Sequence, residues 1–245
     1  MNCVPDCYRG VWARRPLEAP DRRDDSTFVR WLQTSAWHAD MRVPAGSAAL
    51  DAPHALAAQQ GFCGVTDISS SPEGEVCTWL RRYDFQPPRG GVDAGLMVFE
   101  SPDRIIENGI HAPYREVWER LPDSCGRFIV LAGVDDLGVD SHHRFLVAGC
   151  YAMHVRPRQS AWPPDTLPGQ SLADVLAKHP ELAQVLLDFE ISFGTLKSGL
   201  WSIEQSTLPA LRGTCKALTM SQISDSHARI NSPAIAGRWQ ILEWC

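Results

Sequence analysis

Several charged residues in this chain have types and spacings suited to acid–base chemistry. They form three pairs along the sequence: Asp40 with Arg42, Arg82 with Asp84, and Glu107 with Glu116. A carboxyl group held beside aromatic surface has a raised pKa, and such a group can donate or accept a proton near neutral pH. We therefore take Asp40, Glu107, Glu116 and Asp84 as candidate catalytic carboxyls. Each pair is more readily explained as a structural ion pair than as a catalytic one, because structural networks of ion pairs also perturb pKa values.

Aromatic residues accompany these charges along the chain. A tryptophan is costly to leave in water and useful for walling a planar or hydrophobic molecule. The residues that we expect to contact such a ligand are Trp31, Gln33, Arg42, Trp79, Arg82, Tyr114, Trp118 and Trp201. The alternative is that the polar residues of this set lie on the solvent-exposed face of a sheet.

Metal and thiol chemistry have little support in the sequence. His142 and His143 are neighbours and would point to opposite faces of a strand, and no His-Glu-x-x-His motif occurs. Cys63, Cys77 and Cys150 lie in apolar strand contexts, where cysteine usually acts as a small buried hydrophobe. We predict no metal site and no cofactor, and we expect the eight scattered cysteines to be reduced thiols.

The elements that would position these residues are short alternating runs rich in β-branched and aromatic residues, bounded by Gly, Pro, Asp and Ser. We expect strands over residues 27–33, 37–43, 76–85, 94–100, 104–108, 114–119, 127–133, 144–155, 185–193, 200–207 and 238–244. Hairpin-length gaps, such as residues 34–36 and 101–103, force neighbouring strands to pair antiparallel. The pattern predicts a mainly β protein, an antiparallel meander closed into a barrel.

Helical periodicity is confined to residues 46–60 and 170–187, where Ser171 is a candidate cap and Pro180 a break. No Rossmann glycine pattern, P-loop or nucleophile elbow occurs. The punctuated stretch at 157–171 reads as a long crossover loop, because too few strands follow it to make an independent barrel. We therefore predict a single domain over residues 1–245 with one or two short helices.

Composition limits the partners of the chain. With 245 residues and a formal net charge of −6, it carries no clustered basic run that would bind a phosphate backbone. Its start lacks the pattern of a secretory signal, and no apolar run approaches the length of a membrane helix. We expect a cytoplasmic protein that contacts neither nucleic acid nor membrane, with a homodimer left open.

One short motif resembles a known superfamily. The segment Tyr8-Arg9-Gly10-Val11-Trp12 is similar to the Gly-x-Trp entry strand of lipocalin-like, or calycin, barrels. The resemblance implies a calycin-like barrel in which Trp12 plugs one end and is not a ligand residue. Calycins typically carry small organic molecules, some bind haem as nitrobindins do, and some related barrels are cofactor-free isomerases, hydratases or cyclases.

The sequence leads to three functional hypotheses. The first is a barrel cavity that binds a small, partly polar organic molecule. Such a protein is either a carrier or a cofactor-independent isomerase, hydratase or lyase. The enzyme would use a carboxyl group for proton transfer and an arginine to hold an oxyanion. The second is haem binding through a histidine, the candidates being His111, His142, His143 and His154. The third is a non-catalytic interaction module that recruits a protein partner through exposed aromatics and edge strands.

Overall fold

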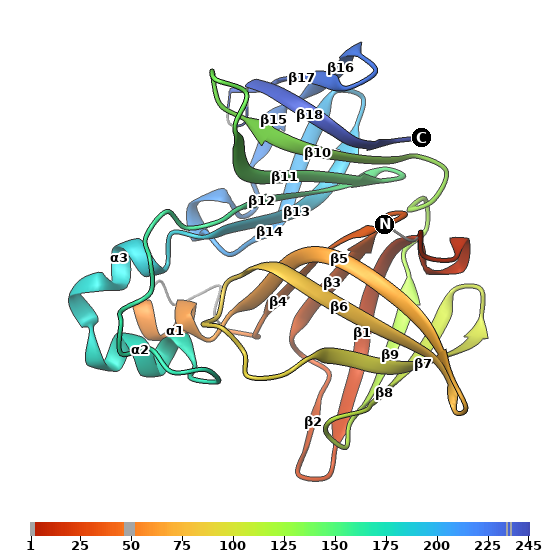
Figure 1. Ribbon diagram of the computed structural model, residues 1–245, viewed down its shortest axis with the longest axis vertical. Helices are drawn as coiled ribbons and strands as arrows, with labels where there is room; N and C mark the ends of the chain where they lie inside the picture. The colour runs from red at the N-terminus through yellow and green to blue at the C-terminus, as the bar shows by residue number, and fades with distance from the viewer. Residues whose placement is uncertain (1–2, 47–51, 234, 236) are drawn as a thin grey trace.

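The chain forms two antiparallel β-sheets that pack one above the other (Figure 1). The computed structural model describes residues 3–46, 52–233, 235 and 237–245. Each sheet contains nine strands within these residues. The prediction of a mainly β, antiparallel fold with few short helices is confirmed.

The first sheet takes the amino-terminal half of the chain. Its strands are β1 (Gly10–Ala19), β2 (Arg22–Asp24), β3 (Phe28–Gln33), β4 (Trp37–Val43), β5 (Gln60–Ser71), β6 (Gly74–Asp84), β7 (Asp93–Ser101), β8 (Arg104–Gly109) and β9 (Arg115–Arg120). Strand β1 pairs with both β3 and β9, so eight strands close into a barrel, and β2 extends the end of β1 as a hairpin. The predicted closed barrel is therefore present.

The second sheet begins after Arg120 and does not join the barrel. Its strands are β10 (Phe128–Val134), β11 (Asp140–Ala148), β12 (Tyr151–Arg156), β13 (Glu190–Lys197), β14 (Leu200–Ser206), β15 (Cys215–Ala217), β16 (Thr219–Ser224), β17 (His227–Asn231) and β18 (Gly237–Trp244). The strand order is β15-β14-β13-β12-β11-β10-β18-β17-β16, with no pairing between β15 and β16 to close it. The sequence did not separate these strands from the barrel, and the single-domain assignment stays a prediction.

Alternation along β4 shows how the two sheets fit together. Trp37, Ala39, Met41 and Val43 are buried in a core cluster that also holds Val130, Leu146 and Met153 of the second sheet. His38, Asp40 and Arg42 take the other face of the strand and point into the barrel, because successive side chains of a strand alternate. One strand thus supplies an apolar interface on its outer face and polar groups on its inner face.

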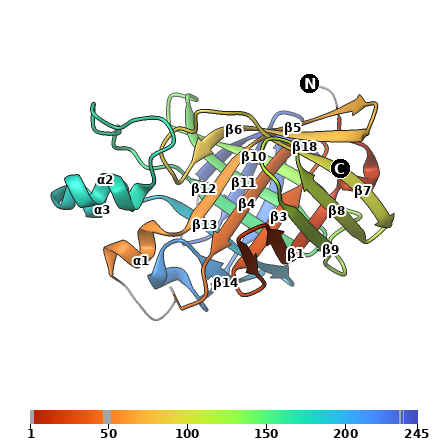
Figure 2. The ribbon, with the colours of Figure 1, turned by 90° about the horizontal axis from the view of Figure 1, so that it is seen from below.

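The helices gather at one side of the molecule, beside the same end of the barrel (Figures 1 and 2). They are α1 (Pro53–Ala57), α2 (Leu172–Lys178) and α3 (Ala183–Leu186), with the 3-10 turn η3 (Pro180–Leu182) between the last two. Ser171 caps α2 in a reciprocal capping box, as the sequence predicted. The predicted helix at 46–60 is shorter, and its residues 47–51 lie outside the described part of the chain. Among the described residues, no helix is long and apolar enough to cross a membrane.

Candidate functional site

The closed end of the barrel is filled by tryptophans. Trp31 packs against Trp12, Trp79 and Trp118 with ring centroids 6.2, 5.5 and 5.7 Å apart. Trp12 is fully buried, and its Nε1 donates to the carbonyl of Tyr8 at 2.7 Å. Trp12 therefore lies within the tryptophan cluster that fills this end of the barrel. Trp31 and Trp118 are part of the same buried cluster and are not among the residues that line the cavity at the opposite end of the barrel.

The opposite end of the barrel is open and charged. A cavity of about 410 Å³ lies there, with Trp79 and Tyr114 in its wall. Five arginines line it: Arg14, Arg22, Arg42, Arg81 and Arg89. Four carboxyl groups line it as well: Asp24, Asp93, Glu107 and Glu116. We call this cavity the barrel mouth.

Most of these charges are ion-paired across strands. Arg14 contacts Glu116 at 2.9 Å, with both side chains buried, and it also contacts Asp24. Arg42 lies 2.8 Å from Asp40 and 3.9 Å from Glu116. Pairing is required here, because a buried charge without a partner strongly destabilises a fold. The predicted association of Asp40 with Arg42 is thus present as an ion pair beneath the barrel mouth.

A bulge in β6 changes the partner of Asp84. Cys63 lies opposite Tyr83 while the next residue of β5 lies opposite Arg81, so Arg82 is the extra residue. Arg81, not Arg82, therefore points inward, and it pairs with Asp84 at 2.9 Å and Asp93 at 2.5 Å. The predicted pairing of Arg82 with Asp84 is wrong: Arg82 points away from the mouth, with its guanidinium 4.9 Å from the ring centroid of Trp37.

Glu107 differs from the other carboxyl groups of the barrel mouth. It is 3% exposed, and no arginine or lysine of the described chain lies within ion-pairing distance of it. Its oxygens instead accept hydrogen bonds from the Tyr114 hydroxyl at 2.6 Å and from Nε1 of Trp118 at 2.9 Å. Burial and the facing Glu116 raise the pKa of Glu107 to about 8. The barrel mouth therefore contains one carboxyl group poised to exchange a proton near neutral pH.

Backbone geometry makes room for this carboxyl group. Gly95 on β7 lies beside Glu107 of β8, and a Cβ at position 95 would stand only 2.6 Å from Cγ and 2.9 Å from Cδ of Glu107. At such distances a side chain at position 95 would force the side chain of Glu107 to shift. Glycine is therefore needed for the carboxyl group to take its place against the wall of the cavity.

Besides Trp31, Trp118 and Arg82, two further predicted ligand residues do not line the barrel mouth. Gln33 is buried and accepts hydrogen bonds from Trp31 Nε1 at 3.2 Å and from the Thr66 hydroxyl at 2.7 Å, which is a structural role inside the barrel. Trp201 belongs to the second sheet, where it packs edge-on against Phe145 with ring centroids 5.6 Å apart. Pattern alone could not separate Trp201 from the barrel tryptophans, because strand alternation does not say which sheet a strand joins.

The histidines are also dispersed. His154 is buried in the second sheet, and its Nδ1 lies 3.0 Å from Glu190. Burial and His154 lower the pKa of the neighbouring His143 to about 4. His111 and His142 are exposed. Within residues 3–46, 52–233, 235 and 237–245, no three His, Cys, Asp or Glu side chains gather as metal ligands.

The sequence-based selection missed six of the nine charged residues that line the mouth: Arg14, Arg22, Asp24, Arg81, Arg89 and Asp93. Arg14 and Arg81 could have been found by alternation, since each stands two residues after an inward-facing tryptophan, Trp12 or Trp79. Arg89 lies in the connection between β6 and β7, where no periodicity exists to indicate direction.

Comparison with known proteins gives a fold without a function. The chain matches no protein-family model and no curated protein. It is similar to the crystal structure of the uncharacterized protein YLR301w of Saccharomyces cerevisiae, with a TM-score of 0.59 over 96% of this chain and 98% of that one. At 11% sequence identity, this likeness extends to the architecture alone, a barrel followed by a second sheet.

Proposed function

We propose that the barrel mouth binds a small, partly polar organic molecule, in the manner of a calycin-like barrel. Mouths of β-barrels are common ligand sites, and a volume of about 410 Å³ suits a small metabolite. The observation that carries the proposal is Glu107, a buried carboxyl group that lines the cavity without a cationic partner. A fold retains such a group at a cost in stability, which favours a role in binding or chemistry.

The tryptophans also favour a pocket over an exposed interaction surface. Of the nine in the sequence, seven are buried: Trp12, Trp31, Trp37, Trp79, Trp118, Trp201 and Trp239. Trp162 and Trp244 are half-buried. A module that recruits a partner through a contiguous aromatic patch would expose several of them.

The chemistry that suits this cavity is proton transfer without a cofactor. Glu107 stands opposite Glu116 on the adjacent strands β8 and β9. Glu116 forms an ion pair with Arg14 at 2.9 Å, whereas Glu107 has no cationic partner and burial raises its pKa to about 8. Two carboxyl groups in contrasting environments can divide the roles of acid and base. An isomerase, hydratase or lyase would use Glu107 as the proton donor and an arginine of the mouth to hold the developing oxyanion.

The test is a thermal-shift screen of small polar metabolites against the wild-type protein and the Ala58→Trp variant. Ala58 is exposed and lines the mouth, so an indole at this position fills the cavity without disturbing the core. We expect compounds that stabilise the wild type and fail to stabilise the variant. A hit that binds the variant equally well would refute binding in the mouth. For a hit that is turned over, unchanged turnover by Glu107→Gln would refute the assignment of the proton donor.

Haem binding is a second candidate function, and a single histidine, His154, favours it. Nε2 of His154 has no hydrogen-bond partner, and its Nδ1 contacts the carboxylate of Glu190, as in histidines that ligate metals. However, its ring is packed by Phe145, Trp201 and Trp239 at centroid distances of 6.3 to 6.4 Å. A colourless preparation without a Soret band after haem addition would remove this candidate.

A further inference from the structure

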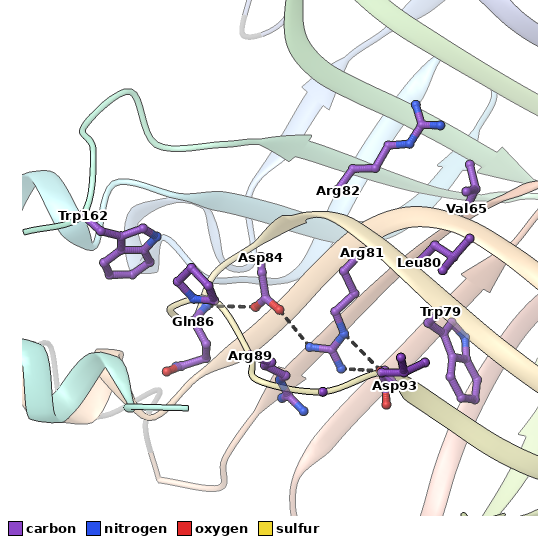
Figure 3. A pocket seen from close by; sticks show the side chains of 13 residues that line it. Val65, Trp79, Leu80, Arg81, Arg82, Asp84, Gln86, Arg89, Asp93 and Trp162 are labelled. Atoms are coloured by element: carbon purple, nitrogen blue, oxygen red, sulfur yellow. Dashed lines mark hydrogen bonds and ion pairs between the residues drawn. The ribbon is translucent and has the colours of Figure 1, made fainter. Parts of the chain in front are cut away.

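A second cavity adjoins the barrel mouth on the outer side of the barrel wall. This groove has a volume of about 700 Å³ and runs from Trp79 toward Trp162 (Figure 3). Trp79, Arg81, Arg89 and Asp93 line both the groove and the barrel mouth. The two spaces are therefore neighbours that share one wall.

That wall is incomplete. Strands β6 and β7 pair from Glu75 opposite Met97 to Trp79 opposite Asp93, and the pairing stops there. Strand β6 continues to Asp84 beside β5, while residues 85–92 leave the sheet before β7 begins. The side chain of Arg81 spans the gap to reach Asp93 (Figure 3). The side chains of Arg81 and Asp93 therefore lie at the boundary between the groove and the mouth.

The groove is more apolar than the mouth. Val65, Leu80, Pro88, Val92 and Trp162 line it. Leu80 is 49% exposed and Val92 is 62% exposed. Exposed aliphatic side chains that gather in a concave site mark a place where an apolar group is bound.

Arg89 is exposed at the junction of the two spaces and forms no ion pair within the described residues, although Asp84 and Asp93 lie near enough to act on its charge. Its hydrogen bond to Oε1 of Gln60 is long, at 3.3 Å. The neighbouring cation Arg81, by contrast, has two carboxylate partners. A guanidinium without a counter-ion beside a cavity favours a carboxylate, sulfonate or phosphate group as its partner.

We propose that the ligand is an amphipathic molecule whose acidic head binds Arg89 at the mouth and whose apolar tail occupies the groove lined by Leu80, Val92 and Trp162. This inference rests on the proposed small-molecule function and adds the chemical class of the ligand. The charged mouth and the apolar groove share Trp79, Arg81, Arg89 and Asp93, so both ends of such a molecule can be bound side by side.

Two fluorescent dyes test the proposal directly. The probes are 1-anilinonaphthalene-8-sulfonate, which has an acidic head and an aromatic body, and the uncharged Nile red. The variants are Arg89→Ala and Leu80→Asp. Their matched controls in the second sheet are Arg229→Ala, another exposed arginine, and Leu200→Asp, at a leucine that is 50% exposed compared with 49% for Leu80.

We expect Leu80→Asp to weaken both dyes about tenfold, since a charge in the groove opposes apolar binding. Arg89→Ala should weaken the sulfonate dye by about tenfold to a hundredfold, the loss expected for a charge-assisted hydrogen bond, and leave Nile red unchanged. Both controls should bind like the wild type.

Equal dye binding by Leu80→Asp and Leu200→Asp would overturn the proposal, as would equal effects of Arg89→Ala on the two dyes. Absence of dye binding by the wild type would also overturn it. These outcomes leave the metabolite screen against Ala58→Trp untouched, because that variant fills the mouth and not the groove. The two proposals therefore fail separately.

Discussion

Replacing Glu107 with glutamine should change how the stability of the protein depends on pH. Burial raises the pKa of Glu107 to about 8 in the folded state, compared with 4.5 in its absence. The folded state thus binds this proton more tightly than the unfolded state. The carboxyl group has no effect on stability below about pH 4 and increasingly destabilises the fold as pH rises toward the folded pKa. A neutral glutamine lacks this dependence.

The magnitude follows from the two pKa values. Between pH 5 and pH 9, ionisation of Glu107 removes roughly 4 kcal/mol from the free energy of unfolding of the wild type, at about 1.4 kcal/mol for each unit of difference. Glutamine can keep both contacts, since its oxygen accepts from Trp118 and its amide donates to the oxygen of Tyr114. The stability of Glu107→Gln relative to the wild type should therefore increase by about this amount between the two pH values.

The assay is urea denaturation followed by tryptophan fluorescence at pH 5, 7 and 9. The other titrating groups are shared by the two proteins, so the contributions of those that do not interact with Glu107 cancel in the difference between them. A difference that stays constant within about 1 kcal/mol from pH 5 to pH 9 would refute a raised pKa for Glu107. The same result would also refute the acid–base role proposed for Glu107.

Three further predictions concern other parts of the fold. Gly95→Ala should destabilise the protein by about 1–3 kcal/mol in urea, because its Cβ would displace the side chain of Glu107, and it should abolish metabolite binding in the thermal-shift screen. Burial raises the pKa of Glu190, but the contacts with His154 and Ser192 outweigh burial and lower this pKa to about 2. The ionised carboxylate of Glu190 therefore stabilises the fold by about 3 kcal/mol above pH 5, and this stabilisation is lost as pH falls from 4.5 toward 2. In acid denaturation, the stability of Glu190→Gln should depend less on pH in that range than the stability of the wild type. Trp201→Phe should destabilise the second sheet by about 1–3 kcal/mol and leave metabolite binding unchanged, whereas weaker binding would contradict its place outside the barrel.

Local pattern was sufficient where strands are regular. Residues 37–43 were predicted as a strand with Asp40 and Arg42 on one face, and β4 has these bounds and this inner face. The hairpin through residues 34–36 set its register with β3, because short loops leave few alternatives. The face of β4 and its register with β3 both depend on residues that are close in the chain, so both can be predicted from the sequence.

Pattern failed where a single residue interrupts alternation. The extra residue in β6 exchanged the directions of Tyr83 and Asp84, and nothing in the order of residue types marks the bulge. Residues 144–155 were predicted as one strand but form a hairpin between β11 and β12. Gly149 turns the chain there with a φ of 57°, where a Cβ would lie 1.9 Å from the carbonyl oxygen of Asp123. That constraint comes from a distant segment, which a local pattern cannot contain.

Strand partnership was the other limit. Strand β18 inserts beside β10, although most of the second sheet separates the two in sequence. A run of alternating residues shows that a segment is a strand but not which strand it will pair with. The assignment of Trp201 to the barrel site shared this origin, since its aromatic character matches that of Trp79 while its sheet differs.

The seam between β1 and β9 links the site to the folding of the barrel. Arg14 on β1 and Glu116 on β9 form their ion pair across this seam, from positions 102 residues apart in the chain. Contacts of such long range form late, because the intervening chain must be ordered first. The charged wall of the mouth therefore does not exist until the barrel has closed. Amide hydrogen exchange of these two strands then measures how often a folded molecule loses the charged wall of the mouth, since opening the seam also separates Arg14 from Glu116.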